Sequence, residues 1–324
     1  MFKLFENQEI SDKEIEEFVV KWRAKGETPH ELKELVNLIY SKQEPISGFE
    51  ESIDVCGTGG DKLNTFNIST LTAIVISSLG LKVIKHSGRS STSITGSIDI
   101  LSNEGISIDA RKDITEECLK KYNLMFVGSK KLRDTFGKVK EVCKKIALPG
   151  FVNLIGPISN PYLTNYHLLG ISNPAWGKLL AETLKLLNNK NKALIVCSSV
   201  KENGYMDELS FCGTNKIWKL ENRQINEENF KISSLLIEKI DINDLIIKDK
   251  NESKKAFEDV LKGKGESKEL ESKIKTVALN SGAALYLANK IPSIEKGYSN
   301  SLEVIQSGKA WEHFNNFRNF INSN

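Results

Sequence analysis

The chain has 324 residues, and its 45 basic against 42 acidic side chains give a formal net charge of +3. This near balance disfavours a nucleic-acid partner. A hydrophobic content of 40% with 27% charged residues is typical of a globular protein with a large core. No apolar stretch reaches the length that spans a bilayer, so we expect no membrane partner.

The cysteines are scattered and form no C-x-x-C pair, which predicts reduced thiols and argues against a disulfide framework or a zinc site. The first residues are charged early and their apolar run is short, so they show no signal-peptide pattern. We therefore expect a cytoplasmic protein. The five cysteines are Cys56, Cys118, Cys143, Cys197 and Cys212.

Two helices are predicted within residues 1–46. Ser11 and Thr28 are good N-cap residues, and each precedes apolar side chains at helical spacing. Residues 43–48, which include Pro45, predict a linker.

Short strand patterns alternate with helical ones from Ile53 onward, which predicts an α/β domain with a largely parallel sheet. The charged stretch 262–275 is expected to be a solvated loop and helix face. The predicted strands are 53–56, 82–85, 125–128, 168–172, 192–197 and 216–219, and the predicted helices are 71–79, 113–122, 130–147, 176–187, 253–263, 274–289, 298–308 and a C-terminal one.

A glycine-rich loop follows the first predicted strand, with the sequence Asp-Val-Cys-Gly-Thr-Gly-Gly-Asp over residues 54–61. Glycine allows positive φ and leaves backbone N–H groups open to an anion. Asn67, Ser69 and Thr70 then place an amide and hydroxyls at a helix start, where the helix dipole favours phosphate. Ordinary turn and capping chemistry explains the same residues, and the loop is neither a P-loop nor a dinucleotide fingerprint. A polyphosphate site is the first interpretation.

Two further polar segments follow predicted strands. Residues 85–99 begin with Lys85 and Arg89 and continue with hydroxyls and glycines, an inventory that suits a pyrophosphate but also a polar surface loop. Asp207 and Glu208 are adjacent carboxylates of the kind that bind magnesium shared with phosphates, although solvated acids look the same in sequence. In open α/β sheets such segments meet beyond the carboxyl ends of the strands.

Several motifs recur in the order known for one family, over nearly the whole chain. The chain resembles the anthranilate phosphoribosyltransferases, within the nucleoside phosphorylase/phosphoribosyltransferase fold class. The resemblance implies an α/β protein whose small all-helical domain, residues 1–48 plus about 130–163, is hinged to a larger α/β domain with a mostly parallel central sheet, residues 49–129 plus 164–324. It also implies a homodimer that contacts through the helical parts. The motifs are Gly57-Thr58-Gly59-Gly60-Asp61, Asn67-Ile68-Ser69-Thr70, Lys85-His86, Ser93, Gly96-Ser97, Asp99, Gly156-Pro157, Asn160-Pro161, Met206-Asp207-Glu208 and Leu279-Asn280.

The activity that the resemblance implies is magnesium-dependent transfer of the 5-phosphoribosyl group of 5-phosphoribosyl diphosphate (PRPP) to a small aromatic amine, with anthranilate of tryptophan biosynthesis as the first choice. Ser69, Asp207 and Glu208 match the positions that hold Mg²⁺. Lys85 and Arg89 are expected to act electrostatically on the leaving diphosphate, and no side chain is expected to act as a nucleophile. The positions implied for PRPP are Gly57, Thr58, Gly59, Gly60, Asp61, Thr65, Asn67, Ile68, Ser69, Thr70, Lys85, Ser93 and Ser97. Those implied for the acceptor are Gly57, His86, Gly88 and Pro149.

The departures from the family pattern cluster on the acceptor side. Gly88 stands where the family has the asparagine that contacts anthranilate, and Pro149 stands where it has the arginine that meets the anthranilate carboxylate. Residues 128–131 replace a His-Pro-rich stretch. Losing a forked donor opposite a carboxylate typically costs ~2–5 kcal/mol unless another cation replaces it. The candidate replacements are Lys130, Arg133, Lys144 and Lys145.

Three alternatives remain at this point. The acceptor is a different small aromatic or amine; or the enzyme resembles pyrimidine nucleoside phosphorylases, whose Lys-x-Ser-Gly-Arg matches residues 85–89; or the chain is a non-catalytic relative that binds nucleic acid. The glycine loop and the Asn-x-Ser-Thr segment have the transferase form, and Asp207-Glu208 has no role without magnesium and diphosphate. The near-neutral charge disfavours the third alternative.

Overall fold

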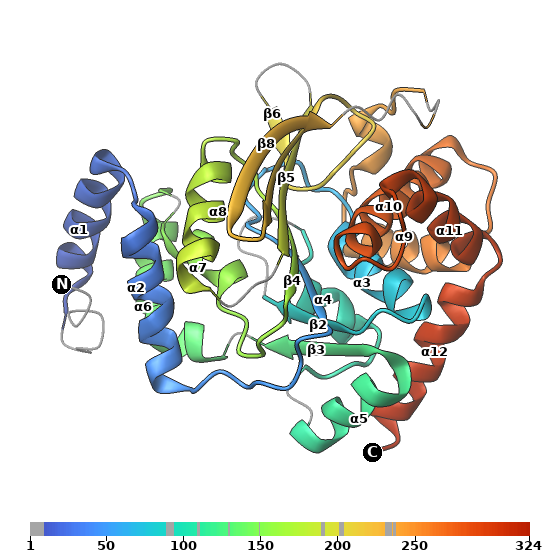
Figure 1. Ribbon diagram of the computed structural model, residues 1–324, viewed down its shortest axis with the longest axis horizontal. Coiled ribbons are helices and arrows are strands. Elements are labelled where there is room, and N and C mark those ends of the chain that lie inside the picture. Colours follow the sequence, from blue (N-terminus) through green and yellow to red (C-terminus); the bar gives the residue numbers. More distant parts are fainter. Residues whose placement is uncertain are drawn as a thin grey trace.

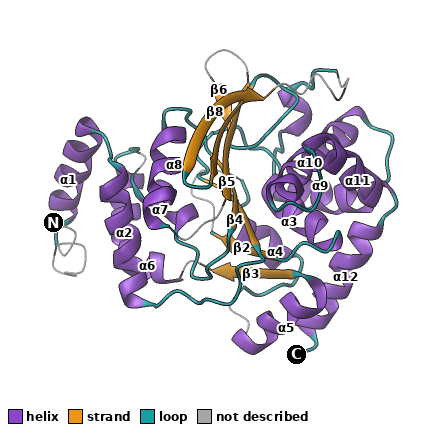
Figure 2. Ribbon diagram, viewed as in Figure 1, coloured by secondary structure: helices purple, strands orange, loops and turns teal. Residues whose placement is uncertain are grey.

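The computed structural model describes residues 10–88, 94–108, 111–128, 130–148, 150–188, 192–200, 204–230, 235 and 238–324. Helices and strands alternate through most of this length (Figures 1 and 2). The helices are α1 (Asp12–Lys25), α2 (Pro29–Lys42), α3 (Ile68–Ser78), α4 (Ser97–Asn103), α5 (Lys112–Tyr122), α6 (Lys130–Lys145), α7 (Val152–Ile158), α8 (Trp176–Leu187), α9 (Lys250–Lys262), α10 (Lys268–Leu287), α11 (Ile294–Gln306) and α12 (Lys309–Asn322), with a 3₁₀ turn, η3 (Ile242–Leu245). The strands are β1 (Ile53–Gly57), β2 (Val83–Ser87), β3 (Leu124–Gly128), β4 (Tyr166–Gly170), β5 (Lys192–Val200), β6 (Gly204–Met206), β7 (Asn215–Glu221) and β8 (Gln224–Phe230).

The central sheet has the strand order β3-β2-β1-β4-β5-β7-β8, and β6 pairs with β5. The five strands from β3 to β5 run parallel, whereas β6, β7 and β8 are antiparallel additions. Gly57 at the end of β1 pairs with Gly170 at the end of β4, so the loops that follow these strands leave the same edge of the sheet. The expected α/β architecture with a mostly parallel sheet is confirmed.

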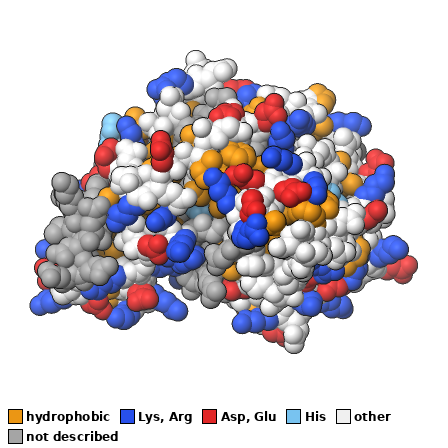
Figure 3. Space-filling model, turned by 90° about the horizontal axis from the view of Figure 1, so that it is seen from below, with side chains coloured by type: hydrophobic (Ala, Val, Ile, Leu, Met, Phe, Trp, Pro, Cys, Tyr) orange, Lys and Arg blue, Asp and Glu red, His pale blue; other side chains and the backbone are white. Residues whose placement is uncertain are grey.

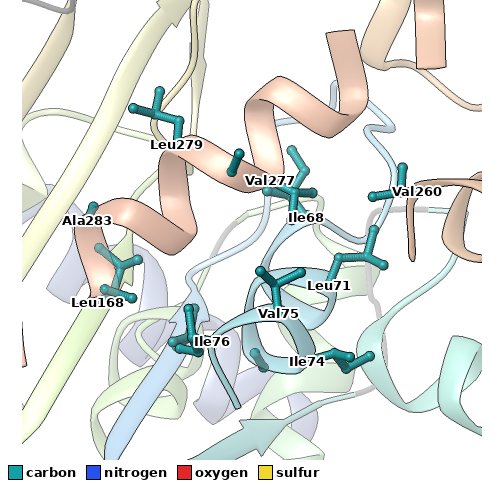
Figure 4. Close-up of a cluster of buried hydrophobic side chains, with 14 of the residues drawn as sticks. Ile68, Leu71, Ile74, Val75, Ile76, Leu168, Val260, Val277, Leu279 and Ala283 are labelled. Carbon is teal, nitrogen blue, oxygen red and sulfur yellow. The ribbon is translucent and has the colours of Figure 1, made fainter. Parts of the chain in front are cut away.

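The larger hydrophobic core lies between one face of the sheet and the helices α3, α9, α10, α11 and α12. In Figure 4, Leu71 and Val75 of α3 lie below Val277 of α10, and Leu168 of β4 lies to one side, below Leu279. All five side chains are buried. Helix α3 is apolar on nearly all sides because both the sheet and α10 cover it.

A second core lies on the opposite face of the sheet and joins α1, α2, α6, α7 and α8 to β4, β5 and β7 (Figure 1). Ser11 and Thr28 cap α1 and α2 through complete capping boxes with Glu14 and Glu31, as their spacing predicts. Trp22 of α1 packs edge-on against Phe151, which precedes α7. This contact ties the N-terminal helices to the segment around α7.

Several boundaries differ from those predicted. Helix α3 begins at Ile68, so Ser69 and Thr70 form its first turn instead of preceding it. Helix α10 begins at Lys268 and includes Lys273, whose Nζ donates to the carbonyl oxygen of Asp244 at 2.6 Å, so the stretch 262–275 is not solvated throughout. The elements α4, α7, β6 and β8 were not predicted; β8 is almost wholly polar, and α7 contains Pro157.

Basic and acidic side chains are intermixed on the face shown in Figure 3, in keeping with the small net charge. Among the residues that the structure describes, no helix combines the length and apolar character needed to cross a membrane.

Candidate active site

A cavity of about 280 Å³ opens where β1 and β2 end, between the loops of the sheet and the helices α6 and α7. Among the predicted site residues that the structure describes, all but Gly60 and Thr70 line it. Arg89, Ser93 and Pro149 lie outside the described residues. The lining residues include Gly57, Thr58, Gly59, Asp61, Thr65, Asn67, Ile68, Ser69, Lys85, His86, Gly88, Ser97, Asp207 and Glu208.

The glycine loop has the conformation that its sequence predicts. Gly59 and Gly60 have φ values of +63° and +85°, which L side chains adopt at a cost. The N–H of Thr58 donates to the carbonyl oxygen of Gly170 at 2.9 Å. The hydroxyl of Ser172 donates to the carbonyl oxygen of Gly59 at 2.8 Å. The end of β4 therefore fixes the loop that follows β1.

Asp207 reaches this loop from the segment after β6. Its Oδ2 accepts a hydrogen bond of 2.8 Å from the N–H of Gly59, which we expected to face a phosphate. A Cβ at Gly57 or at Gly170 would overlap Asp207, so both positions need glycine for this close approach. The anion that the loop holds in this structure is the protein's own carboxylate.

The segment behind Asp207 is anchored by Asn280 of α10, the polar residue of the Leu279-Asn280 motif. Its Oδ1 accepts from the N–H of Leu209 at 3.0 Å, and its Nδ2 donates to the Leu209 carbonyl oxygen at 2.8 Å. Asn280 is fully buried, so these bonds are shielded from water. Helix α10 thereby sets the position of Asp207 and Glu208.

Three carboxylates gather at this end of the cavity. Burial and, after it, the charge of Asp207 together raise the pKa of Asp61 to about 7. Burial also raises the pKa of Asp207 and holds the pKa of Glu208 well above its ordinary value. The Oδ2 of Asp61 is buried and makes no hydrogen bond within the described part of the chain. Buried carboxylates held this close call for a cation or for protons.

The donor set fits a hard divalent cation. The carboxylates of Asp61, Asp207 and Glu208 line the same cavity as the hydroxyl-bearing Ser69. Oxygen ligands of this kind suit Mg²⁺. The backbone N–H of Ser69 hydrogen-bonds Glu208, which opposes the rise in its pKa. The three positions predicted for metal binding thus come together, and Asp61, predicted only for PRPP, joins them.

Lys85 lies beneath this group and is only 1% exposed. Its Nζ donates to the carbonyl oxygen of Val55 at 2.6 Å and to Oγ of Ser69 at 3.1 Å. Burial lowers its pKa, while nearby groups that carry negative charge when ionised, including Asp207 and Glu208, oppose that shift. Lys85 therefore both adds positive charge to the acid cluster and fixes the hydroxyl of Ser69.

The side chain of Asn67 joins three segments around the cavity that it lines. It makes no capping bond to α3; it exchanges hydrogen bonds of 3.2 Å with Thr95 and accepts one of 3.1 Å from Ser253 of α9. Thr70 likewise donates to Ser97 at the start of α4, at 3.1 Å. These bonds hold the segment 94–97 against the first turn of α3.

The predicted acceptor side is built on β2. His86 is buried, and its backbone N–H donates to Asp54 at 3.0 Å, while Asn160 donates to the other oxygen of Asp54 at 2.8 Å. A Cβ at Gly88 would meet nothing within 4 Å, so space remains where the family has an asparagine. Gly57 and Gly88 line the same cavity as His86.

The opposite wall comes from α6 and α7 and was largely missed from the sequence. Arg133, Lys140 and Asn153 line the cavity there, and only Arg133 was among the predicted replacement cations. Lys130 and Lys144 are exposed and do not line it, and Lys145 pairs with Asp12 at 2.7 Å. The spacing of residues 133 and 140, two helical turns apart, is the signal that could have identified Lys140.

Comparison with known proteins assigns the class. Residues 50–311 match the family described as glycosyl transferase family, a/b domain. This match covers most of the chain and includes the glycine loop, α3, β2 and the Asp207-Glu208 segment. The fold and the site are therefore those of a glycosyl transferase.

Relatives narrow this class. A protein of Petrotoga mobilis named anthranilate phosphoribosyltransferase is 32% identical over 314 residues, which are 97% of this chain and 88% of the relative. One of the same name from Staphylococcus aureus is 34% identical over 288 residues, 89% of this chain and 83% of the relative. The chain belongs to the anthranilate phosphoribosyltransferase family, as its motifs predict.

Solved structures agree in fold. Anthranilate phosphoribosyltransferase from Thermus thermophilus superimposes with a TM-score of 0.85 at 25% identity, covering 99% of this chain and 93% of that one. The enzyme from Saccharomyces cerevisiae in complex with PRPP and Mg has a TM-score of 0.86 at 22% identity, covering 100% of this chain and 91% of that one. At that identity the second comparison speaks for the fold alone.

Proposed function

We propose that this chain transfers the 5-phosphoribosyl group of PRPP to anthranilate, in a magnesium-dependent reaction of tryptophan biosynthesis. The observation that carries the proposal is the meeting of Asp61, Asp207 and Glu208 with the glycine loop in one cavity. The names of the relatives support the acceptor, and the PRPP and Mg in the yeast structure support the donor and the metal.

Asp61, Asp207 and Glu208 would hold magnesium, which would neutralise charge on the leaving diphosphate. Lys85 holds Ser69 in place, and the N-terminus of α3 directs its dipole toward the same region. Cleavage of the bond from ribose C1 to the diphosphate oxygen develops positive charge on the sugar ring, so positioning and charge matter more than a nucleophilic side chain.

The acceptor amine then attacks C1 from the side of α6 and α7. Phe136 and Val152 line this wall and are buried among apolar neighbours, which limits water beside the reacting carbon. Water exclusion matters because hydrolysis of PRPP competes with transfer. We propose that the helical unit, residues 1–48 plus about 130–163, closes on the α/β unit to complete this barrier.

The test is calorimetric binding of PRPP with and without Mg²⁺, together with loss of anthranilate fluorescence during turnover. Asp207→Asn and Glu208→Gln should each weaken magnesium-dependent PRPP binding by about tenfold or more, because each removes a charged ligand. Asp113→Asn, at an exposed acid of α5, is the control and should bind as the original chain does. PRPP binding that ignores Mg²⁺ in every variant would refute the proposal.

The two other enzyme candidates predict different outcomes. PRPP binding without anthranilate consumption would mean another acceptor. Phosphorolysis of pyrimidine nucleosides is suggested by Lys85, Ser87 and Gly88, but the three carboxylates that line the cavity would repel inorganic phosphate unless a metal lay between them. Uridine phosphorolysis in the presence of EDTA would favour a nucleoside phosphorylase.

We also propose a cytoplasmic homodimer that contacts through the helical unit. Val20 of α1 is 47% exposed, an unusual state for a large apolar side chain in the described part of this chain. None of the five cysteines forms a disulfide, which suits a reducing compartment. Sedimentation velocity tests the dimer: Val20→Lys should shift the protein toward the monomer, and an unchanged dimer would exclude α1 from the contact.

A further inference from the structure

Helix α6 presents one stripe of side chains to the cavity. Arg133, Gly137 and Lys140 are spaced i, i+4 and i+7, so they lie along the same side of the helix, and all three line the cavity. Leu132 and Phe136 flank this stripe with apolar surface. The stripe is therefore a basic strip beside apolar side chains of the same wall.

The two cations of this stripe repel each other. Burial lowers the pKa of Lys140, and the charges of Arg133 and Lys144 lower it further. Within the described residues, no carboxylate lies within ion-pair distance of Arg133 or Lys140, whereas Lys145 on the same helix has Asp12. An anion placed between Arg133 and Lys140 would relieve their repulsion.

Gly137 leaves room for such an anion. A Cβ built at this position would meet nothing within 4 Å, so the cavity is open directly above the helix backbone between the two cations. Arginine offers a planar fork that matches a carboxylate, and lysine adds a point charge. The space is bounded by apolar side chains, which suits an aromatic ring that carries the carboxylate.

The cavity is thus divided by charge. Asp61, Asp207 and Glu208 occupy the end that we propose for magnesium and diphosphate, while Arg133 and Lys140 lie on the α6 wall. A carboxylate-bearing acceptor is repelled by the acidic end and attracted by the basic strip. This arrangement orients the acceptor before the amine meets the sugar.

We propose that Arg133 and Lys140 form the binding site for the carboxylate of the acceptor, with that carboxylate above Gly137. The two side chains then replace the arginine that the family has at the position of Pro149. This inference rests on the proposed function for the identity of the acceptor, but the anion site itself can be tested without turnover.

The first test measures binding of an unreactive probe. Benzoate and the neutral benzamide are titrated calorimetrically into the protein with Mg²⁺ and diphosphate present. Arg133→Met and Lys140→Met should each raise the Kd of benzoate about tenfold or more and leave that of benzamide within about twofold, because only benzoate carries the charge. Lys144→Met, at an exposed lysine one turn further along α6, is the matched control and should change neither.

The second test uses the reaction. Each variant should raise the KM for anthranilate and leave the Kd of PRPP unchanged, and Lys140→Arg should recover much of the loss. Equal benzoate affinity in all variants would overturn the inference. A weakened PRPP affinity would also overturn it, since the cations would then serve the donor's phosphates.

The two proposals fail separately. If the unsubstituted protein binds benzoate through these residues but does not consume anthranilate, the proposed acceptor is wrong and the carboxylate site stands. A chain that consumes anthranilate equally well without Arg133 and Lys140 would keep the proposed function and refute the site.

Discussion

At Gly170 a substitution by alanine, which adds one methyl group, should reduce activity much more than it reduces folding stability. A Cβ there would lie 2.6 Å from the carbonyl carbon of Asp207, and real Cβ contacts of this kind are rarely below 3.4 Å. The same Cβ would also overlap the carbonyl oxygen of Asp207, so the segment that carries Asp207 and Glu208 must shift by more than about 1 Å in Gly170→Ala. Asn280 holds the far side of that segment, so the shift falls on the carboxylates.

The expected cost has two parts. Extra volume in a packed interior costs about 1–3 kcal/mol of folding free energy, which the chain's two large cores can absorb. Misplacing a catalytic group by about 1 Å costs on the order of 100-fold in rate. Gly170→Ala should therefore fold, bind magnesium-PRPP at least tenfold more weakly and lose about 100-fold in kcat/KM for PRPP.

The assay pairs urea unfolding with calorimetric titration of PRPP at fixed Mg²⁺. Gly177→Ala is the matched control, because a Cβ at Gly177 would overlap the ring of Trp218 on the far side of α8, away from the cavity. It should lose comparable stability and keep PRPP affinity. If Gly170→Ala bound magnesium-PRPP as tightly as Gly177→Ala does, the crowding of Asp207 would have no functional consequence and the reasoning would be wrong.

Three further predictions concern single groups. In EDTA, which removes magnesium, the pKa of the Asp61 carboxyl is about 7 in the folded chain and 3.8 in the unfolded chain. The protonated carboxyl therefore stabilises the folded chain fully below pH 3.8, and this stabilisation is lost as the pH rises to 7. That loss is roughly 4 kcal/mol, and urea unfolding of Asp61→Asn across this range should lack it. The thiol of Cys56 lies 3.2 Å from Nε2 of His167 and lines the cavity, so peptide mapping should find it alkylated by iodoacetamide before the other four cysteines, and more slowly with magnesium-PRPP bound. Arg318→Met leaves Glu104 buried without its 2.8 Å ion pair and should cost about 3 kcal/mol in urea unfolding, whereas Glu104→Gln in the same chain should restore part of that loss.

The sequence could predict the turn of the glycine loop and the helix start after it because these signals are local. Three glycines within four residues, and an Asn-x-Ser-Thr segment at a helix start, depend on backbone geometry that neighbouring residues determine. The partner of that loop could not be predicted in the same way. Asp207 lies 148 residues from Gly59, and only the packing of α10 and β6 brings the two together.

The position of the cations on α6 could not be predicted either. Arg133, Lys140, Lys144 and Lys145 look alike as charged positions on one amphipathic helix. Which of them faces the cavity depends on how α6 packs through Phe136 against Phe151, a tertiary contact with no local signature. The sequence thus indicates that a replacement cation is available and leaves its position open.

The two halves of the cavity also differ in how closely they are packed, and this explains why the departures from the family pattern lie where they do. On the donor side a methyl group at Gly57 or Gly170 would collide with Asp207, so these positions tolerate no larger residue without moving a proposed metal ligand. On the proposed acceptor side a Cβ at Gly88 or Gly137 would meet nothing within 4 Å, so a change there alters the shape of the cavity without disturbing the sheet. A chain can therefore change the residues that we propose for the acceptor while it keeps those that we propose for magnesium and PRPP, and the proposed roles of Arg133 and Lys140 are a change of this kind.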